Sequence, residues 1–364
     1  VKDSTKALRV LHEAFFSFPT RKANLFVVGV GTVGSVLLEQ LAAQVEKLRN
    51  EHGIELRLCG LANSRKWVIN PDGIPFTDSK EQLANNGVDS DAAGFVGAMK
   101  NANLHYSIFI DNTANETVAG LYEEVLKANI HIVTPNKIAA SQNYDSYVGL
   151  KQTARRYGVK YLFETNVGAG LPVIGTLNDL VRSGDRIRRM DAVLSGSLNF
   201  IFNNFTQETK FHEVVRQAQD EGYTEPDPRI DLSGKDVMRK ILILARESGH
   251  ALEMDDIEAE DFMPPSCLAS DSVDDFYAEL EKNAEHFEQL IADADWNGTQ
   301  LKYVATFADG KAKVGLQSVG EGHTFFNLSG KDNIVLFSSD RYDEQPLVIR
   351  GAGAGAEVTA MGVF

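Results

Sequence analysis

Apolar residues in the first half of the chain follow two alternating spacings. Short apolar runs at 24–28, 55–62, 104–111 and 130–133 are separated by segments that include apolar residues at helical spacing. Runs of this length are typical of buried strands, and the intervening pattern is typical of amphipathic helices. This rhythm predicts an α/β domain over 22–165, built around a mainly parallel sheet.

The pattern changes after about residue 165, where helical and extended stretches mix without a regular βαβ order. Ala308-Asp309-Gly310 lies between two predicted strands and is a hairpin signal. We therefore predict an α+β domain over 166–345. Its expected elements are helices at 172–182, 211–220, 234–248 and 272–293, and strands at 187–195, 301–307, 312–318, 333–338 and 347–350.

The two ends of the chain have patterns of their own. Residues 1–21 contain the amphipathic stretch KALRVLHEAFF, which predicts a linker helix or a helix that packs on the first domain. Residues 346–364 contain glycines at 351, 353 and 355 ahead of another helical pattern. We expect this closing segment to return to the first domain, and a low-complexity tail is the alternative.

Three glycines directly follow the first predicted strand, in the order Gly29, Gly31, Gly34. The first permits a tight turn, the second lets the backbone approach a pyrophosphate, and the third lets the helix pack close to the strand. The helix that follows offers unpaired N–H groups and the positive end of its dipole. The stretch predicts a Rossmann-type dinucleotide site that includes Thr32 and Val33, with a plain tight turn as the alternative.

The end of the second predicted strand bears on the type of cofactor. It reads Asn63-Ser64-Arg65-Lys66, with two cations and no carboxylate. A site that selects NAD usually has an acidic residue here, on the ribose 2′-hydroxyl. The composition instead favours a 2′-phosphate, so we predict NADP(H), with NAD(H) as a second acceptable cofactor. The alternative is that Arg65 and Lys66 are ordinary surface charges.

Polar residues also follow the next two predicted strands. Asp111-Asn112-Thr113-Ala114-Asn115 follows one of them, and Thr134-Pro135-Asn136-Lys137 follows the other. In open α/β sheets, cofactors and substrates bind at the carboxyl ends of the strands. Thr113 and Lys137 are therefore candidates for the site, although Lys137 also fits a surface lysine at the start of a helix over 137–157.

An acidic loop precedes a helix in the second domain. Residues 221–231 contain two prolines and four carboxylates, among them Glu225 and Asp231. Ser233 is the expected N-cap of the helix, on which Asp236 and Lys240 share one face because they are four residues apart. The carboxylates suit a cationic amine, and the lysine suits proton transfer to an oxygen of the same substrate. The alternative is a solvated loop followed by a surface ion pair.

A glycine-rich segment, Glu164-Thr-Asn-Val-Gly-Ala-Gly-Leu171, lies near the expected domain boundary. Such a turn can expose several carbonyl oxygens inward, which suits either tight packing or a hard cation. The residue pattern on its own favours packing.

Composition narrows the possible partners and compartments. Of 364 residues, 43% are hydrophobic and 24% charged, which suits a globular chain with an ordinary core. The net charge of -15 argues against a nucleic-acid partner. No apolar run approaches the roughly 18 residues that cross a bilayer, and no N-terminal leader pattern is present. Two cysteines give no disulfide or metal framework, so we expect a reducing cytoplasm.

The motifs together resemble homoserine dehydrogenase over about 22–364. The resemblance includes the signature AQDEGYTEPDPRIDLSGKDVMRK at 218–240, as well as VGVGTVG, DNTAN, TPNK, ETNVGAGLP, SGSLNFI and RGAGAGAEVTA. The helix ALRVLHEAFF resembles the segment that precedes this domain in bifunctional aspartokinase–homoserine dehydrogenases. We therefore expect the full-length protein to be fused to an aspartokinase.

The resemblance implies reversible, NAD(P)H-dependent reduction of L-aspartate 4-semialdehyde to L-homoserine, a step in threonine, methionine and isoleucine biosynthesis. It also implies a homodimer formed through the second, catalytic and dimerisation domain. Another NADP-dependent oxidoreductase of a small amino or hydroxy acid is the alternative enzyme. A catalytically silent cofactor-binding module is the alternative of a different class.

The resemblance also implies roles for individual residues. Lys240 is the expected acid/base, and Lys137 lies near both the nicotinamide and the reacting oxygen. Substrate contacts fall on Glu225, Asp231 and Asp236, and cofactor contacts fall on Thr113 and Gly353 besides the glycine turn. A monovalent cation, Na⁺ or K⁺, would be held by Glu164, Val167, Ala169 and Leu171.

Overall fold

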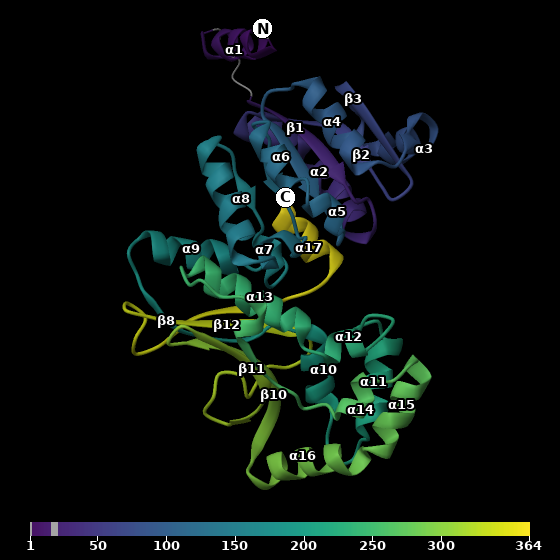
Figure 1. The fold of residues 1–364 in the computed structure, drawn as a ribbon, viewed down its shortest axis with the longest axis vertical. Helices are drawn as coiled ribbons and strands as arrows, with labels where there is room; N and C mark the ends of the chain where they lie inside the picture. The colour runs from purple at the N-terminus through teal and green to yellow at the C-terminus, as the bar shows by residue number, and fades with distance from the viewer. Residues whose placement is uncertain (1, 16–20) are drawn as a thin grey trace. The chain divides into compact units, whose positions relative to one another are not determined.

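The computed structural model describes residues 2–15 and 21–364 (Figure 1). Contacts divide the chain into two compact units. The first unit comprises Val1–Asn166 and Ala356–Phe364, and the second comprises Val167–Gly355. The linker segment expected at 1–21 contains helix α1 (Lys2–Phe15), while residues 1 and 16–20 lie outside the described residues.

The first unit is built on a seven-stranded sheet of order β4-β3-β2-β1-β5-β6-β7. Strands β2, β1, β5, β6 and β7 pair in parallel. Strand β3 pairs antiparallel with β2, and β4 pairs antiparallel with β3. The strands are β1 (Arg21–Val28), β2 (Ile54–Ala62), β3 (Lys66–Ile74), β4 (Val88–Asp89), β5 (Ser107–Asp111), β6 (His131–Val133) and β7 (Tyr161–Leu162). Because β1 lies between β2 and β5, the strand order reverses direction at β1, which is the usual place for a dinucleotide in such sheets.

Helices follow the parallel strands, as the alternating pattern predicts. They are α2 (Thr32–His52), α3 (Ser79–Asn86), α4 (Ala92–Ala102), α5 (Glu116–Ala119), α6 (Tyr122–Lys127), α7 (Ile138–Ser141) and α8 (Tyr144–Arg156), with short 3₁₀ turns η1 (Phe76–Asp78) and η2 (Glu164–Asn166). One core cluster joins Leu25 and Val27 of β1 to Leu37 and Leu41 of α2. The unit therefore buries β1 from its fourth residue onward, which explains the apolar run.

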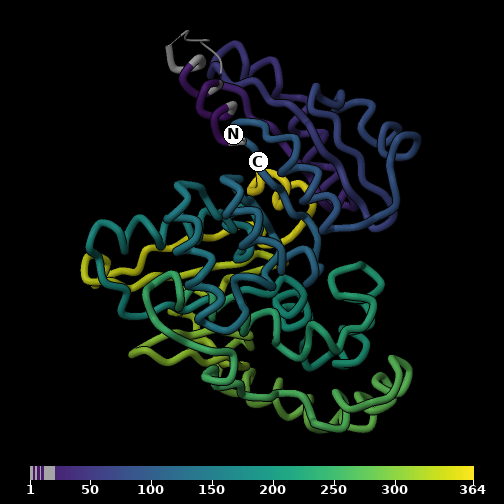
Figure 2. The backbone as a smooth tube through the Cα atoms, turned by 45° about the horizontal axis from the view of Figure 1, so that its top comes forward, coloured from purple at the N-terminus to yellow at the C-terminus, as the bar shows by residue number. Residues whose placement is uncertain are grey.

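The last helix of the chain, α17 (Ala356–Val363), belongs to this first unit and contacts α2. Its Ala360 and Val363 are buried in the same core cluster. Figure 2 shows the yellow C-terminal end among the purple and blue segments of this unit. The return begins at Ala356 and not at residue 346, because Leu347–Ala352 forms strand β13 in the sheet of the second unit.

Several predicted helices are interrupted. The single helix expected over 137–157 is two helices, because Gln142 is extended and the Asn143 side chain accepts from Ser146 N at 2.9 Å to cap α8. The helix expected over 272–293 is likewise two helices that meet at Asn283. Residues 66–74 and 88–89 form β3 and β4, two strands that the sequence pattern did not predict.

The second unit contains a six-stranded sheet of order β13-β12-β8-β10-β11-β9, antiparallel except for the β11–β9 pair. Its strands are β8 (Ile187–Val193), β9 (Ile257–Glu260), β10 (Thr299–Ala308), β11 (Lys311–Gly320), β12 (Asp332–Ser339) and β13 (Leu347–Ala352). The predicted hairpin is confirmed, and it turns on Asp309 and Gly310, which both have positive φ, 52° and 77°. Strand β9 was not predicted.

The helices of the second unit are α9 (Val173–Arg182), α10 (Gly196–Asn204), α11 (Phe211–Asp220), α12 (Arg229–Leu232), α13 (Lys235–Glu247), α14 (Pro265–Leu268), α15 (Val273–Lys282) and α16 (Ala284–Trp296), with the 3₁₀ turn η3 (Met254–Asp256). Helix α13 packs on β9, β10 and β11 through an apolar face that includes Ile241 and Leu244. The predicted fold class is confirmed as a Rossmann-type α/β unit followed by an α+β unit. Over the described ranges 2–15 and 21–364, no helix is both long and apolar enough to cross a membrane.

Candidate functional site

The glycine turn of the first unit lies at the carboxyl end of β1, between the ends of its two neighbouring strands. Gly29 N donates to Ala62 O of β2 at 2.9 Å, and Asn112 N, after β5, donates to Val28 O at 2.8 Å. Gly31 is the N-cap of α2 and has no side chain to occupy the first N–H groups of the helix. These groups remain available for an anion.

A glycine suits each of the three positions for a different physical reason. Gly29 has φ +88°, and a Cβ there would lie 2.9 Å from both Asn112 C and Thr113 Cγ2. A Cβ on Gly34 would lie 1.9 Å from Gly29 O, so this glycine permits the close packing of α2. At Gly31 nothing lies within 4 Å of the Cβ position, so the space above it is open. An exposed Thr32 and a half-buried Val33 follow. The turn therefore fits a pyrophosphate over Gly31.

Asn112, which was not among the predicted site residues, lies beside this turn. Its Nδ2 is 3.3 Å from the Cβ position of Gly34, and both Nδ2 and Oδ1 are buried without a hydrogen-bond partner among the described residues. Burying an unpaired amide costs free energy, so its presence here needs an explanation. The position of Asn112 at the carboxyl end of β5 is the signal that could have identified it as a candidate site residue.

In the turn after β2, the two cations expected to bind a 2′-phosphate have different surroundings. Asn63 Oδ1 accepts from the backbone N of Arg65 at 2.8 Å and of Lys66 at 2.7 Å, which fixes the turn. Lys66 Nζ donates to Ala84 O at 2.6 Å, so this ammonium already holds α3. Ser64 and the Arg65 side chain are exposed. Of the two cations, Arg65 is therefore the more exposed.

A buried carboxylate joins the loops that carry Thr113 and Lys137. Asp111 is fully buried; its Oδ1 accepts from Thr113 N at 2.8 Å, and its Oδ2 accepts from Tyr122 Oη at 2.6 Å and Asn136 Nδ2 at 3.0 Å. Burial raises the pKa of Asp111, and these hydrogen bonds oppose the rise. This carboxylate thus holds the backbone of Thr113 and the side chain of Asn136, and Lys137 follows as the half-buried N-cap of α7.

Lys240 of the second unit is buried in a polar setting. Its side chain leaves α13, and the residue is only 8% exposed. Nζ lies 2.7 Å from Asp236 Oδ2, one helical turn earlier, and donates to Leu194 O at 2.6 Å. An ammonium has three N–H donors, so two are held by the protein and one remains for a ligand. The prediction that Asp236 and Lys240 share one face of the helix is confirmed.

Asp231 holds the acidic loop. Its Oδ1 accepts from Ser197 Oγ at 2.8 Å, and its Oδ2 accepts from Glu225 N at 2.9 Å. Burial raises the pKa of Asp231, and the nearby Asp236 charge adds to the rise. Both oxygens already have protein donors, whereas the Glu225 side chain is exposed. Ser197, at the start of α10, was missed by the sequence interpretation.

The start of α13 differs from the prediction. Ser233 is the C-cap of the preceding short helix, and Gly234, with φ +68°, is the N-cap of α13. A Cβ on Gly234 would lie 2.1 Å from Tyr303 Oη, so the sheet approaches the backbone closely here. Asp227 pairs with Arg229 at 2.6 Å, which holds the pKa of that carboxyl below its usual value. Asp227 therefore belongs to a local ion pair.

The segment expected to hold a cation spans the division between the two units. Glu164 belongs to the first unit and Val167–Leu171 to the second, and Ala169 has φ +52° within the turn. Leu171 N donates to Gly168 O at 2.9 Å, and Val173 N donates to Leu171 O at 2.8 Å. The Leu171 carbonyl therefore already has one donor. Among the described residues, no group of three or more His, Cys, Asp and Glu side chains is arranged to hold a metal ion.

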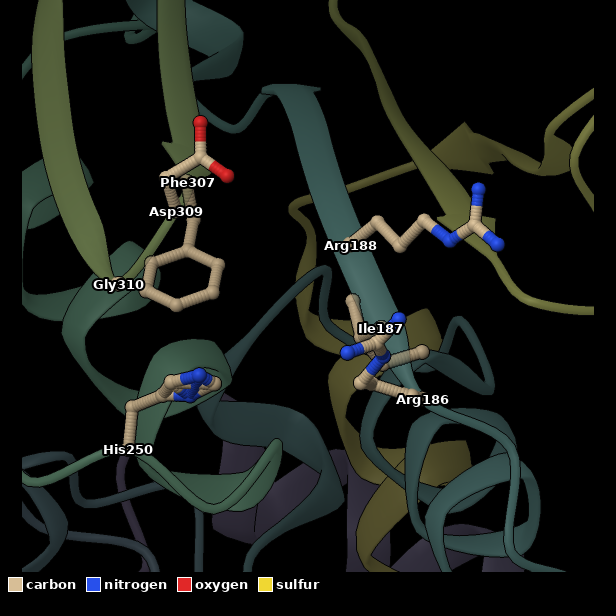
Figure 3. Close-up of a pocket in the computed structure, with 7 residues that line it drawn as sticks. All are labelled: Arg186, Ile187, Arg188, His250, Phe307, Asp309 and Gly310. Atoms are coloured by element: carbon tan, nitrogen blue, oxygen red, sulfur yellow. The ribbon is translucent and has the colours of Figure 1, made fainter.

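A pocket of about 600 Å³ in the second unit lies where β8 begins and the β10–β11 hairpin turns (Figure 3). Its lining residues are Arg186, Ile187, Arg188, His250, Phe307, Asp309 and Gly310. In Figure 3 Arg188 extends away from Phe307 and His250, and its guanidinium is held by Asp340 and Asp343 at 2.7 and 2.8 Å. No predicted site residue lines this pocket.

A Rossmann-type unit with an open glycine turn, joined to a unit that buries one lysine beside carboxylates, has the organisation of a nicotinamide-dependent oxidoreductase. Comparisons with known proteins define the class further. The model of the homoserine dehydrogenase NAD-binding domain matches residues 29–164, and the homoserine dehydrogenase model matches residues 172–364. The chain belongs to the homoserine dehydrogenase family.

Relatives with similar sequences are fused proteins. The chain is 40% identical to a chloroplastic bifunctional aspartokinase/homoserine dehydrogenase 2 of Zea mays, over 100% of this chain and 40% of that protein. It is also 40% identical to a bifunctional aspartokinase/homoserine dehydrogenase of Haemophilus influenzae, over 99% of this chain and 44% of that protein. The chain thus spans about two fifths of the length of these relatives.

Solved structures share the fold. A Candida auris protein of unknown function is similar with a TM-score of 0.86 and 32% identity, over 94% of this chain and 96% of that chain. A hyperthermophilic archaeal homoserine dehydrogenase in complex with NADPH is similar with a TM-score of 0.72 and 23% identity, over 94% and 95% of the two chains. At this lower identity the likeness establishes the shared fold.

Proposed function

We propose that this chain catalyses the reversible, NADP(H)-dependent reduction of L-aspartate 4-semialdehyde to L-homoserine. The observation that carries the proposal is the setting of Lys240, whose ammonium is held at two points and keeps one donor for a ligand. An oxygen that gains negative charge during reduction needs such a donor. Family membership makes the semialdehyde the substrate to test first.

The protein's own residues would bind and orient the substrate. Glu225 and Asp236 present carboxylates to the substrate ammonium, and Asp231 fixes the backbone of Glu225. Lys240 then gives a proton to the oxygen of the former aldehyde. NADPH, when bound at the glycine turn, supplies the hydride. Positioning is the main contribution of the chain, because the cofactor carries the hydride chemistry.

We infer the cofactor type from the composition of the turn after β2. No carboxylate is present to bind a ribose 2′-hydroxyl, and Arg65 is exposed beside Ser64. We propose that Arg65 binds the 2′-phosphate, while Lys66 mainly anchors α3. Thr113 and Lys137 would lie near the nicotinamide, placed by the buried Asp111.

Further parts of the proposal concern ions and partners. A monovalent cation, Na⁺ or K⁺, would bind to Glu164 and the carbonyl oxygens of Val167, Ala169 and Leu171. The chain would act as a homodimer, and the full-length protein would carry an aspartokinase, as the names of the relatives state for them. The two cysteines are free and buried, which fits a reducing compartment such as the cytoplasm.

The deciding experiment is a steady-state assay of L-homoserine oxidation, followed by the absorbance of the reduced nicotinamide. It compares NADP with NAD, each with and without sodium or potassium. Turnover with L-homoserine and NADP supports the proposal. Turnover only with other small amino or hydroxy acids would assign a different oxidoreductase, and a lack of turnover with every substrate would leave a binding module. Arg65→Ala should raise the KM for NADP and change the KM for NAD little.

A further inference from the structure

Asn333 of β12 shares a hydrogen-bond acceptor with Lys240. Its Nδ2 donates to Leu194 O at 3.2 Å, and Lys240 Nζ donates to the same oxygen at 2.6 Å. A carbonyl oxygen has two lone pairs, so it accepts from both groups at once. Each donor that binds the carbonyl also restrains the direction in which the other lone pair points.

The amide of Asn333 is retained at a cost. The residue is fully buried, and its Oδ1 has no hydrogen-bond partner among the described residues. A buried acceptor without a partner is unfavourable, and an apolar side chain of similar size would avoid that cost. The Nδ2 donor is the part of the side chain that the structure uses.

Gly353 keeps this amide in place. A Cβ at Gly353 would lie 1.9 Å from Asn333 Cγ, 2.2 Å from Nδ2 and 2.4 Å from Oδ1. Gly353 does not have the positive φ that favours glycine elsewhere in the chain, so its backbone conformation would accept alanine. The contact with Asn333 alone requires a glycine here. The family resemblance instead suggests a direct cofactor contact for Gly353.

We propose that Asn333 is a positioning residue, which aims the Leu194 carbonyl at the Lys240 ammonium and is held in turn by the bare backbone of Gly353. Lys240 is then fixed from two sides. Asp236 holds it from its own helix, and the Leu194 carbonyl, which Asn333 of β12 orients, holds it from the other side. The catalytic meaning of this arrangement rests on the proposed function. The geometric meaning does not, so each can be tested without the other.

The first test measures the acylation rate of Lys240 Nζ in the protein without substrate, by peptide mass spectrometry after treatment with an amine-reactive ester. Asn333→Ala should increase this rate several-fold, because the ammonium loses an oriented acceptor. If Asn333→Ala does not fold, Asn333→Ser serves in its place, because it keeps a small polar side chain that is too short to reach Leu194 O. An unchanged rate in the folded variant overturns the proposal.

Asn199 provides the matched control. It is also a buried asparagine of the second unit, its Nδ2 donates to Gly330 O at 3.0 Å and Asp332 O at 3.3 Å, and its Oδ1 is likewise unpartnered. Asn199→Ala removes the same kind of interaction without touching Leu194 O. It should leave the acylation rate of Lys240 within about twofold of the parent. An increase equal to that of Asn333→Ala would show general loosening and overturn the specific role.

The second test is a double-mutant cycle with Gly353→Ala, read by turnover and by NADPH affinity. Gly353→Ala and Asn333→Ala should each lower kcat by about tenfold, the size expected for one lost hydrogen bond at a reacting group. In the Asn333→Ala background, Gly353→Ala should lower kcat by less than about twofold, because the clash is gone. An equal loss in both backgrounds, together with weaker NADPH binding, would mean that Gly353 acts by contacting the cofactor and would overturn the coupling.

The two levels of the proposal fail in different ways. If the parent enzyme does not oxidise L-homoserine, the proposed function fails, and the acylation rates still decide whether Asn333 positions Lys240. If the parent enzyme is active and Asn333→Ala keeps its full turnover, the positioning role fails and the proposed function stands.

Discussion

Two buried lysines of the second unit make a natural pair for comparison. Lys240 is 8% exposed and Lys302, on β10, is 1% exposed. Each donates to one backbone carbonyl, Lys240 to Leu194 O at 2.6 Å and Lys302 to Leu328 O at 2.8 Å. Their second partners differ: Lys240 has the carboxylate of Asp236, and Lys302 has the amide oxygen of Asn203.

The difference distinguishes Lys240, the proposed proton donor, from Lys302, for which we propose no catalytic role. Burial without a carboxylate lowers the pKa of Lys302 to about 8. Lys240 is paired with a carboxylate whose side chain is 46% exposed, so the pair is accessible to a ligand. Burial alone therefore does not set Lys240 apart from Lys302, whereas the carboxylate partner and the exposure of that partner do.

The largest expected effect is on Lys240. Lys240→Met keeps most of the side-chain volume and removes the amine that would give a proton in the reduction and take one in the oxidation. We expect kcat for L-homoserine oxidation to fall by about 10²–10⁴-fold, the usual contribution of a general acid or base, with little change in NADPH affinity. Steady-state kinetics and a cofactor titration measure the two quantities. Turnover close to that of the parent would remove Lys240 from the proposed role.

The matched change at Lys302 should affect stability and not turnover. The folded protein releases this proton near pH 8 and the unfolded chain near 10.5, so between these values the unfolded state binds more protons and stability rises with pH. The rise is about 3 kcal/mol for a shift of this size. Lys302→Met should lack it, as measured by urea unfolding at several pH values, while kcat at neutral pH stays unchanged. The same rise in both proteins would contradict the assigned pKa.

Removing the carboxylate partner of Lys240 should have a smaller effect than removing the lysine. In Asp236→Asn the substrate ammonium loses one of its proposed ligands, and Lys240 Nζ loses its charged partner. We expect kcat/KM for L-homoserine to fall by about tenfold, the value of one charge-assisted hydrogen bond. The KM for NADP serves as the internal control and should not change. Equal losses for both substrates would indicate a general distortion of α13.

The smallest effect is expected at the partner of Lys302. Asn203→Ala removes a neutral acceptor of the buried ammonium and the donor to Gly330 O at 3.2 Å. We expect the free energy of unfolding at neutral pH to fall by about 1–2 kcal/mol, and kcat to stay within about twofold. A loss of turnover comparable to that of Asp236→Asn would remove the distinction between the two lysines.

Local signals in the sequence identified most of the elements and several of the candidate site residues. The glycine spacing after β1 and the four-residue spacing of Asp236 and Lys240 depend on backbone geometry that is the same in every protein, so both could be predicted. The interrupted helices were missed because Asn143 and Asn283 end or begin a helix through local contacts that weak helical periodicity does not reveal. Strands β3, β4 and β9 lie at or next to sheet edges, where the apolar pattern is weak.

The site residues that the sequence interpretation missed depend on contacts across long chain separations. Ser197 bonds Asp231, 34 residues later, and Asn333 bonds the Leu194 carbonyl, 139 residues earlier. Asp111 and Asn112 are adjacent in sequence, yet the Asp111 carboxylate has several donors while the Asn112 amide has no partner among the described residues. Neither the composition nor the spacing of residues predicts such pairings.

The sequence alone determined the order of the two domains, the glycine turn and the helix that presents Lys240, because short-range sterics and helical periodicity decide these features. Tertiary structure alone decided which acceptors hold the Lys240 ammonium, that Asp231 restrains a loop, and why Gly353 has no side chain. These outcomes depend on which distant strands and helices pack together, and a hydrogen bond or a steric contact exists only once that packing has formed.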